Sequence, residues 1–211
     1  MVDAPKTKKP GPYADAPRLP EGDFVDARTL VRGDWLEIEV GPGRGGFMFE
    51  RAAAESGAAL IGLEVRRKWA AIVDVRLAKG GLAPRARVFA EDAKDALPRL
   101  GPDGAFRRAF LHFPDPWWKK RHRKRLVMGD AFLEQIARLL EKGGELFVQT
   151  DVDERIDEYE SQILACPSFA AAGDAPGSAR LVENPYGARS PREHRAITDG
   201  LPVHRLRFVR R

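Results

Sequence analysis

The stretch Leu36-Glu37-Ile38-Glu39-Val40-Gly41-Pro42-Gly43-Arg44-Gly45-Gly46 joins an alternating apolar run to a glycine-rich turn. The run is typical of a strand, and residues 47–55 after the turn are predicted to form a helix. Gly41, Gly43 and Gly46 have the spacing G-x-G-x-x-G, which lets a backbone turn approach a ligand and directs a helix N-terminus at it. Alone, this spacing fits nicotinamide, flavin and S-adenosylmethionine sites equally.

Strands and helices alternate on the C-terminal side of this turn. Further strands are expected over residues 59–64, 87–90, 109–113 and 145–150, and helices over residues 67–79, 93–100, 127–140 and 154–164. This alternation predicts βαβ units and therefore an α/β fold with a parallel sheet. Beyond Pro167, proline and glycine become more frequent, and residues 203–209 are predicted to form a last strand. Residues 1–22 are expected to be a flexible tail, which leaves residues 23–211 as one domain.

Acidic residues near the ends of three expected strands narrow the choice of ligand. Glu37 and Glu39 share one face of a strand that should be buried, where a carboxylate is costly unless it is paired or faces a ligand. Two acids beside the turn would repel a pyrophosphate and would suit the ammonium and sulfonium of S-adenosylmethionine. Glu64 stands where an acid accepts hydrogen bonds from ribose hydroxyls, and Asp92 is placed to accept one from an adenine amino group. Singly, each acid is more often a helix cap or a surface charge, but together they favour a cofactor site.

A second stretch, Phe113-Pro114-Asp115-Pro116-Trp117-Trp118, is followed by the basic block 119–125. Each proline fixes its own φ and biases the preceding residue toward an extended conformation, so Asp115 is expected in a stiff turn at a strand end. The net charge is +5, and this block holds six Lys or Arg, so the basic character is local. A turn carboxylate and a solvated basic face are the plain alternatives. The occurrence of the Asp115 turn and the basic block on either side of two tryptophans favours a site that acts on a nucleic acid.

Composition excludes several classes of protein. The chain has 211 residues, 43 % hydrophobic and 32 % charged, which is typical of a soluble globular protein. No apolar run approaches the 18 or more residues of a membrane span, and the N-terminus lacks the apolar region of a secretory signal. With one cysteine, Cys166, and no spaced histidine cluster, we expect a cytoplasmic protein without a disulfide or a metal, either a monomer or a homodimer.

From about Leu36 to Phe208 the chain resembles the bacterial tRNA (guanine-N7-)-methyltransferases, which are class I S-adenosylmethionine-dependent methyltransferases. The segment from Phe113 to His122 is close to the hallmark of that family, and residues 62–65, 92–93 and 150–151 follow in the family's order. The resemblance implies a Rossmann-like α/β fold, a doubly wound and mostly parallel sheet with an antiparallel C-terminal strand. It implies methyl transfer from S-adenosylmethionine to N7 of a guanine in the variable loop of tRNA.

The resemblance also implies roles for individual residues. Asp115 would be the catalytic or cofactor-adjacent acid. The implied cofactor-binding residues are Glu37, Gly41, Gly43, Glu64 and Asp92. The implied contacts to tRNA or guanine are Lys119, Asp151, Ser190, Glu193 and Arg195. There are departures from the family pattern: Glu39 stands where glycine is common, and Arg192 replaces an aromatic residue.

The expected chemistry needs no general base, because guanine N7 carries a lone pair and no proton. Asp115 is therefore expected to accept hydrogen bonds from the guanine edge or to help hold the cofactor, and catalysis would be mainly alignment. Three alternatives remain: the same cofactor with a protein or small-molecule substrate, a non-catalytic RNA-binding protein with a relic cofactor site, and a nicotinamide dehydrogenase. Glu37 and Glu39 disfavour the last of these.

Overall fold

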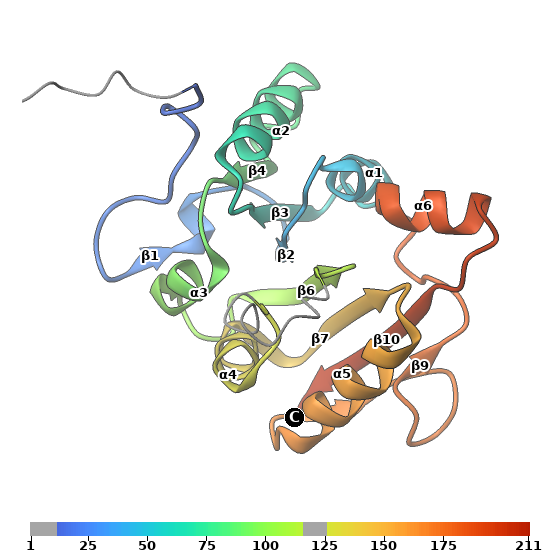
Figure 1. The fold of residues 1–211 in the computed structure, drawn as a ribbon. Coiled ribbons are helices and arrows are strands. Elements are labelled where there is room, and N and C mark those ends of the chain that lie inside the picture. Colours follow the sequence, from blue (N-terminus) through green and yellow to red (C-terminus); the bar gives the residue numbers. More distant parts are fainter. Residues whose placement is uncertain (1–11, 116–125) are drawn as a thin grey trace, which may run out of the picture.

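The computed structural model describes residues 12–115 and 126–211. Eight strands form one sheet in the order β4-β3-β2-β6-β7-β10-β8, and β9 also pairs with β10 (Figure 1). Strands β2, β3, β4, β6 and β7 are mutually parallel, whereas β10 runs antiparallel to β7. The mostly parallel α/β sheet with an antiparallel C-terminal strand is thus confirmed. The parallel strands are Trp35–Val40 (β2), Ala58–Leu63 (β3), Ala86–Phe89 (β4), Phe106–His112 (β6) and Leu140–Thr150 (β7).

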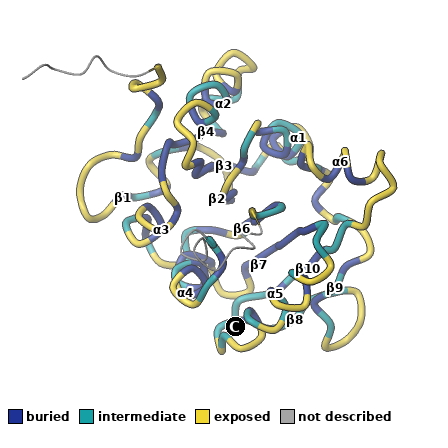
Figure 2. Tube along the Cα trace, in the orientation of Figure 1, coloured by how far each residue is buried: buried dark blue, intermediate teal, exposed yellow. Residues whose placement is uncertain are grey.

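Helices cover both faces of the sheet (Figure 1). On one face, α1 (Gly46–Ala54) and α2 (Arg67–Lys79) pack through an apolar cluster against β3 and β4. The opposite face carries the larger core, which includes residues of α4 (Asp130–Leu139) and α5 (Asp153–Ala165). Residues of the central strands are buried, whereas exposed residues lie on the outer turns of the helices and in the loops (Figure 2). Both faces of the parallel strands are therefore buried, as in other parallel sheets.

Several short elements of the fold were not predicted. After Cys166 these are β8 (Phe169–Ala171), β9 (Arg180–Leu181) and α6 (Pro191–Thr198), whereas the last strand, β10 (His204–Arg210), was predicted. A two-stranded sheet joins β1 (Val25–Asp26) and β5 (Leu100–Gly101), and a short helical turn covers Ala27–Thr29. The helix expected over residues 93–100 consists of two short turns, Ala93–Ala96 (α3) and Leu97–Arg99. The helix expected over residues 127–140 is shorter, because it begins at Asp130 and β7 already starts at Leu140.

The tail expected over residues 1–22 is too long. Ala16 and Leu19 are each only 5 % exposed. The backbone N–H of Leu19 donates to Glu91, whose carboxylate also pairs with Arg18 at 2.8 Å. The Ala90 N–H donates to the Pro17 carbonyl. Residues 16–19 are therefore packed on the domain, because two apolar side chains and a buried carboxylate hold them there.

Candidate functional site

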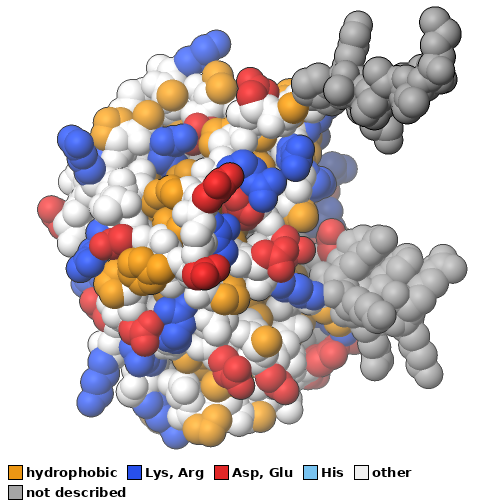
Figure 3. Space-filling view, turned by 90° about the vertical axis from the view of Figure 1, so that its left-hand side faces the viewer, with side chains coloured by type: hydrophobic (Ala, Val, Ile, Leu, Met, Phe, Trp, Pro, Cys, Tyr) orange, Lys and Arg blue, Asp and Glu red, His pale blue; other side chains and the backbone are white. Residues whose placement is uncertain are grey.

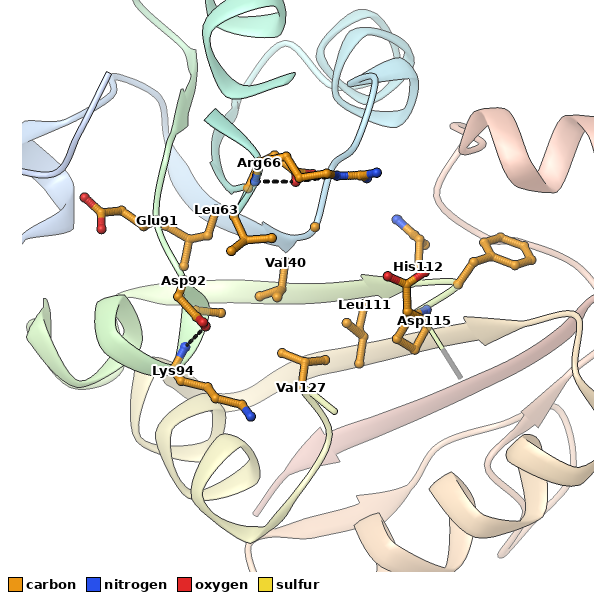
Figure 4. Close-up of a pocket in the computed structure, with 16 residues that line it drawn as sticks. Val40, Leu63, Arg66, Glu91, Asp92, Lys94, Leu111, His112, Asp115 and Val127 are labelled. Carbon is orange, nitrogen blue, oxygen red and sulfur yellow. Dashed lines mark hydrogen bonds and ion pairs between the residues drawn. The ribbon is translucent and has the colours of Figure 1, made fainter. Parts of the chain in front are cut away.

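A cavity of about 720 Å³ opens at the carboxyl ends of β2, β3, β4 and β6. Ligands of open α/β sheets bind at this edge. Asp92 and Asp115 lie at opposite ends of the cavity, and Val40, Leu111 and Val127 lie between them (Figure 4). The cavity is thus polar at its two ends and apolar in the middle, and its size suits a nucleoside-containing cofactor.

The glycine-rich turn forms one edge of this cavity. Gly41 and Gly43 have φ angles of 75° and 53°, in the left-handed region that favours glycine, and a Cβ atom at either position would meet nothing within 4 Å. Their backbone is therefore open to an approaching ligand. The third positive-φ glycine is Gly45, not Gly46, and a Cβ atom on it would lie 2.3 Å from a methyl carbon of Val73. Gly45 lets α2 pack closely against the turn.

Glu64 and Asp92 both line the cavity at strand ends, as expected from their positions in the sequence. The Glu64 carboxylate accepts hydrogen bonds from the backbone N–H groups of Gly43 and Arg66, each at 2.9 Å. Glu64 is therefore tied to the glycine-rich turn and keeps further acceptor capacity, because an ionised carboxylate has about four acceptor sites. Asp92 is the N-cap of α3 and accepts from the Lys94 N–H at 3.0 Å. A helix cap and a ligand contact are compatible roles for this side chain.

Asp115 follows a strained backbone. Phe113 has a φ of 46°, which is unusual for a residue with a side chain, and its N–H donates to the Gln149 carbonyl at 2.8 Å. A strained backbone conformation persists only where the surrounding structure holds it, and such conformations cluster at functional sites. The bond to β7 fixes the direction in which Pro114 and Asp115 leave the sheet. Asp115 is exposed and lines the cavity.

A second cavity of about 430 Å³ adjoins the first. It shares six residues with the first cavity: Gly41, Arg66, His112, Phe113, Pro114 and Asp115. Its remaining wall comes from the glycine-rich turn, from the segment that precedes α5 and from the start of α6. Two cavities therefore meet at Asp115.

Glu39 and His112 form a buried pair beside this junction. His112 Nδ1 lies 2.8 Å from Glu39 Oε1, and each side chain is 3 % exposed. Among the described residues, Glu39 Oε2 and His112 Nε2 have no hydrogen-bond partner. The His112 ring also packs against Phe47, with centroids 4.4 Å apart. Both residues line the second cavity, and neither was in the predicted site. The sequence signal for Glu39 is its position two residues before Gly41.

Glu37 lies elsewhere, so a cofactor role does not fit it. Its side chain is fully buried and outside both cavities. Its two oxygens accept from Arg51 Nε and Nη2 at 2.8 Å, and also from Trp35 and Arg108 at 2.9 Å. Burial alone would raise the pKa of Glu37, but the hydrogen bonds and charge of Arg51, with bonds from Trp35 and Arg108, outweigh it and lower the pKa. Because every oxygen is already paired within the protein, Glu37 holds α1 to β2.

Of the expected substrate contacts, two line the second cavity. Asp151 pairs with Arg192 Nε at 2.8 Å, and the Ser190 hydroxyl accepts from the Glu193 N–H as the N-cap of α6. Glu193 itself is fully buried and pairs with Arg205 at 2.9 Å, so it stabilises this segment instead of facing a ligand.

The two remaining substrate predictions differ in outcome. Arg195 lies outside both cavities, where it pairs with Asp199 on the exposed side of α6. Its expected contact with RNA therefore does not follow from this arrangement. Lys119 lies outside the described residues.

Within the described ranges, no group of three or more His, Cys, Asp or Glu side chains is arranged to hold a metal ion. No described helix is long and apolar enough to cross a membrane.

The hydrogen-bond acceptors and apolar side chains that line the first cavity fit S-adenosylmethionine. Glu64 and Asp92 line the cavity as acceptors that would suit ribose hydroxyls and an adenine amino group, while Val40, Leu111 and Val127 would contact the apolar part. At the end away from Asp92, the carboxylates of Asp115 and Glu64 lie beside the glycine-rich turn at Gly41. Carboxylates suit an ammonium and a sulfonium, and they disfavour a pyrophosphate. The cavity therefore matches this cofactor better than a dinucleotide.

Comparisons with known proteins agree with this geometry. A family described as "Putative methyltransferase" matches residues 34–206. The curated tRNA (guanine-N(7)-)-methyltransferase of Anaeromyxobacter dehalogenans is 37 % identical, with 87 % of this chain and 90 % of that protein covered. The protein of the same name from Myxococcus xanthus is 34 % identical, with 83 % of each chain covered.

Solved structures show the same fold at lower identity. The 16S rRNA methyltransferase KamB superposes with a TM-score of 0.58 at 16 % identity, covering 87 % of this chain and 91 % of that one. TrmN from Thermus thermophilus gives a TM-score of 0.59 at 18 % identity, covering 85 % and 45 %. The sheet order, the two cavities and these relatives lead to one assignment: the chain belongs to the tRNA (guanine-N(7)-)-methyltransferase family.

Proposed function

We propose that this protein methylates N7 of a guanine in tRNA with S-adenosylmethionine as the methyl donor. One observation carries the proposal: the cofactor-sized cavity and a second cavity meet at Asp115. A donor held in the first cavity and a base held in the second would face each other at this junction. The names of the curated relatives support guanine N7 as the acceptor and tRNA as the substrate.

The residues of the first cavity would bind and orient the cofactor. When bound, S-adenosylmethionine supplies an activated methyl group on a sulfonium. Glu64 and Asp92 would fix the nucleoside end, and Gly41 and Gly43 would allow close approach of the backbone. Glu37 has no place in this assignment, because it lies outside both cavities. Glu39 lines the second cavity, and its second carboxylate oxygen has no partner among the described residues, so it would face the reacting groups from that side.

The residues of the second cavity would orient the base. Guanine N7 needs no deprotonation, so the protein's task is alignment, which can supply roughly 7–11 kcal/mol of the barrier. Asp115 is exposed at the junction and accepts hydrogen bonds only, which suits the N1–H and amino group of guanine. Asp151 and Ser190 line the same cavity and would complete the pocket. We also infer that the protein works in the cytoplasm.

Mass spectrometry of tRNA nucleosides after reaction tests this function. Unmodified tRNA incubated with the protein and S-adenosylmethionine should gain 7-methylguanosine. Asp115→Asn keeps the size of the side chain but presents two N–H donors, so turnover should fall by about 10²–10³, as for loss of a preorganised polar contact. Methyl groups on another base or on ribose would contradict the proposed product. Full turnover by Asp115→Asn would contradict the proposed role of the carboxylate.

A further inference from the structure

Helix α2 carries several cations without a carboxylate partner in the part of the chain that the structure describes. It contains four basic residues and one acidic residue, a net charge of +3. The acidic residue, Asp74, does not neutralise the other cations of α2, because it pairs with Arg87 of β4 at 2.7 Å and accepts a hydrogen bond from the Val88 N–H at 3.0 Å. Within residues 12–115 and 126–211, no carboxylate lies within ion-pair distance of Arg67, Lys68 or Arg76. Their charges therefore stay available to an anion.

Aromatic rings contact Arg44, Lys68 and Arg76 without cancelling their charge. The Arg44 guanidinium lies 5.1 Å from the centre of the Trp69 ring, and the Lys68 ammonium lies 5.7 Å from it. The Arg76 guanidinium lies 4.9 Å from the Phe49 ring. Its Nη1 also donates to the Arg44 carbonyl at 3.4 Å. A cation–π contact orders a side chain and leaves its net charge intact. We call Arg44, Arg67, Lys68, Trp69 and Arg76 the α2 cationic surface.

The charges of Arg67 and Lys68 do not serve the stability of α2. Arg67 and Lys68 occupy the first turn, which has no acidic residue and no side-chain cap. Cations in a first turn are unfavourable, because the helix dipole is positive at that end. An ordinary solvated helix would gain by having acids at these positions, so their presence needs another explanation.

The α2 cationic surface continues the wall of the second cavity. Arg44 and Arg66 line that cavity, and α2 begins at the residue after Arg66. On the other side, Asp151 and Val152 line the cavity, and α5 begins directly after them. Helix α5 contains five acidic residues and one basic residue, a net charge of −4, and Arg180, which pairs with Asp157 and Glu160, reduces this to −3. The two walls that leave the cavity thus have opposite charge.

The two helices lie at opposite ends of the sheet. Helix α2 contacts β4, whereas α5 contacts β7, β8 and β10, and the sheet order separates these strands (Figure 1). On the face seen in Figure 3, acidic and basic side chains are interspersed. A polyanion that enters the second cavity is therefore attracted along α2 and repelled along α5.

We propose that the RNA backbone next to the target guanine runs over α2 and away from α5, with Arg67, Lys68 and Arg76 contacting phosphates. This inference rests on the proposed function, because it takes RNA as the polyanion in the second cavity. The contacts are to phosphates, so they supply affinity and orientation without reading sequence.

Salt-dependent binding of tRNA tests the inference with a matched control. The test variant is Arg67→Gln/Lys68→Gln/Arg76→Gln. The control variant is Arg107→Gln/Lys142→Gln/Arg211→Gln, which also removes three exposed cations, from the first residues of β6 and β7 and from the end of β10. Each lost phosphate contact should reduce the slope of log K against log salt by about 0.7–0.9. We therefore expect the slope of the test variant to fall by about 2–3, and its affinity to fall on the order of tenfold at low salt.

The control variant should keep the wild-type slope, and calorimetry with S-adenosylhomocysteine should give wild-type affinity in both variants. An unchanged slope in the test variant would overturn the inference. Equal losses in the two variants would overturn it as well, because net charge alone would then explain binding. Methylation is measured in parallel. Wild-type protein that binds tRNA without methylating it would contradict the proposed function, whereas the slopes would still decide the path of the RNA.

Discussion

Replacing Glu37 with glutamine separates a structural role from a cofactor role for this residue. The Glu37 side chain is fully buried, and its partner Arg51 is 2 % exposed. Glu37→Gln leaves the Arg51 guanidinium buried without its main counter-charge. Removal of one partner of a buried ion pair costs about 3–5 kcal/mol. Arg51 keeps the Tyr186 carbonyl at 2.7 Å and Glu55 at 3.6 Å, so we expect the lower end of that range, about 3 kcal/mol.

Thermal and urea unfolding measure this loss. For a chain of this length, about 3 kcal/mol corresponds to a decrease in Tm of about 6–12 °C. The folded variant should bind S-adenosylhomocysteine with wild-type affinity in calorimetry, because Glu37 lies outside both cavities. The double variant Glu37→Leu/Arg51→Met removes both charges and should be more stable than Glu37→Gln, since an apolar pair of similar volume is often as stable as a buried ion pair.

Two results would refute this reasoning. A loss of less than about 1 kcal/mol in Glu37→Gln would mean that the pair does not stabilise the fold. A tenfold weaker cofactor affinity with unchanged unfolding would return Glu37 to the cofactor site. In that case the double variant would share the binding defect and gain no stability over the single one.

The remaining predictions concern pH, the turn and the cofactor acid. The pKa of Glu37 is lowered in the folded state, so the stability that its carboxylate contributes is present above its usual pKa of 4.5 and is lost as pH falls through its lower pKa in the folded protein. The difference in unfolding free energy between wild type and Glu37→Gln should therefore shrink below about pH 4.5. Gly45→Ala should cost about 2–4 kcal/mol in urea unfolding, because its Cβ would meet Val73 at a φ of 74°; Gly41→Ala, with open space around it, should cost only about 1–2 kcal/mol. Glu64→Gln should weaken S-adenosylhomocysteine binding by about tenfold or more, because a charged acceptor is worth about 1.5–3 kcal/mol; an unchanged dissociation constant would make Glu64 purely structural.

The central fold follows from local sequence patterns. Apolar runs that alternate with segments of helical periodicity predicted an α/β fold with a parallel sheet, and the glycine spacing located the turn after β2. The doubly wound arrangement was implied by the family resemblance. These signals are strong because burial of a parallel sheet on both faces requires near-continuous apolar strands. The segment after Cys166 gave weaker signals, because β8 and β9 have only three and two residues and depend on pairing with β10.

The candidate site could be predicted only in part. Glu64, Asp92 and Asp115 line a cavity because each follows a parallel strand, and strand ends are visible in a sequence. Glu37 and Glu39 share a strand face, so periodicity does not distinguish them. Their environments do, because Arg51 of α1 lies beside Glu37 and His112 of β6 lies beside Glu39. Those partners are 14 and 73 positions away in the chain, and only the packed structure brings them together.

Transfer of isotope-labelled methyl groups to two tRNA transcripts tests the central claim most directly. One transcript contains ordinary guanosine, and the other contains 7-deazaguanosine, in which carbon replaces N7 and leaves no lone pair for the methyl group. The account predicts label in the first transcript, recovered as 7-methylguanosine, and none in the second, although both should bind with similar affinity. Equal labelling of the two transcripts would contradict N7 as the acceptor, and label in neither would contradict the proposed activity.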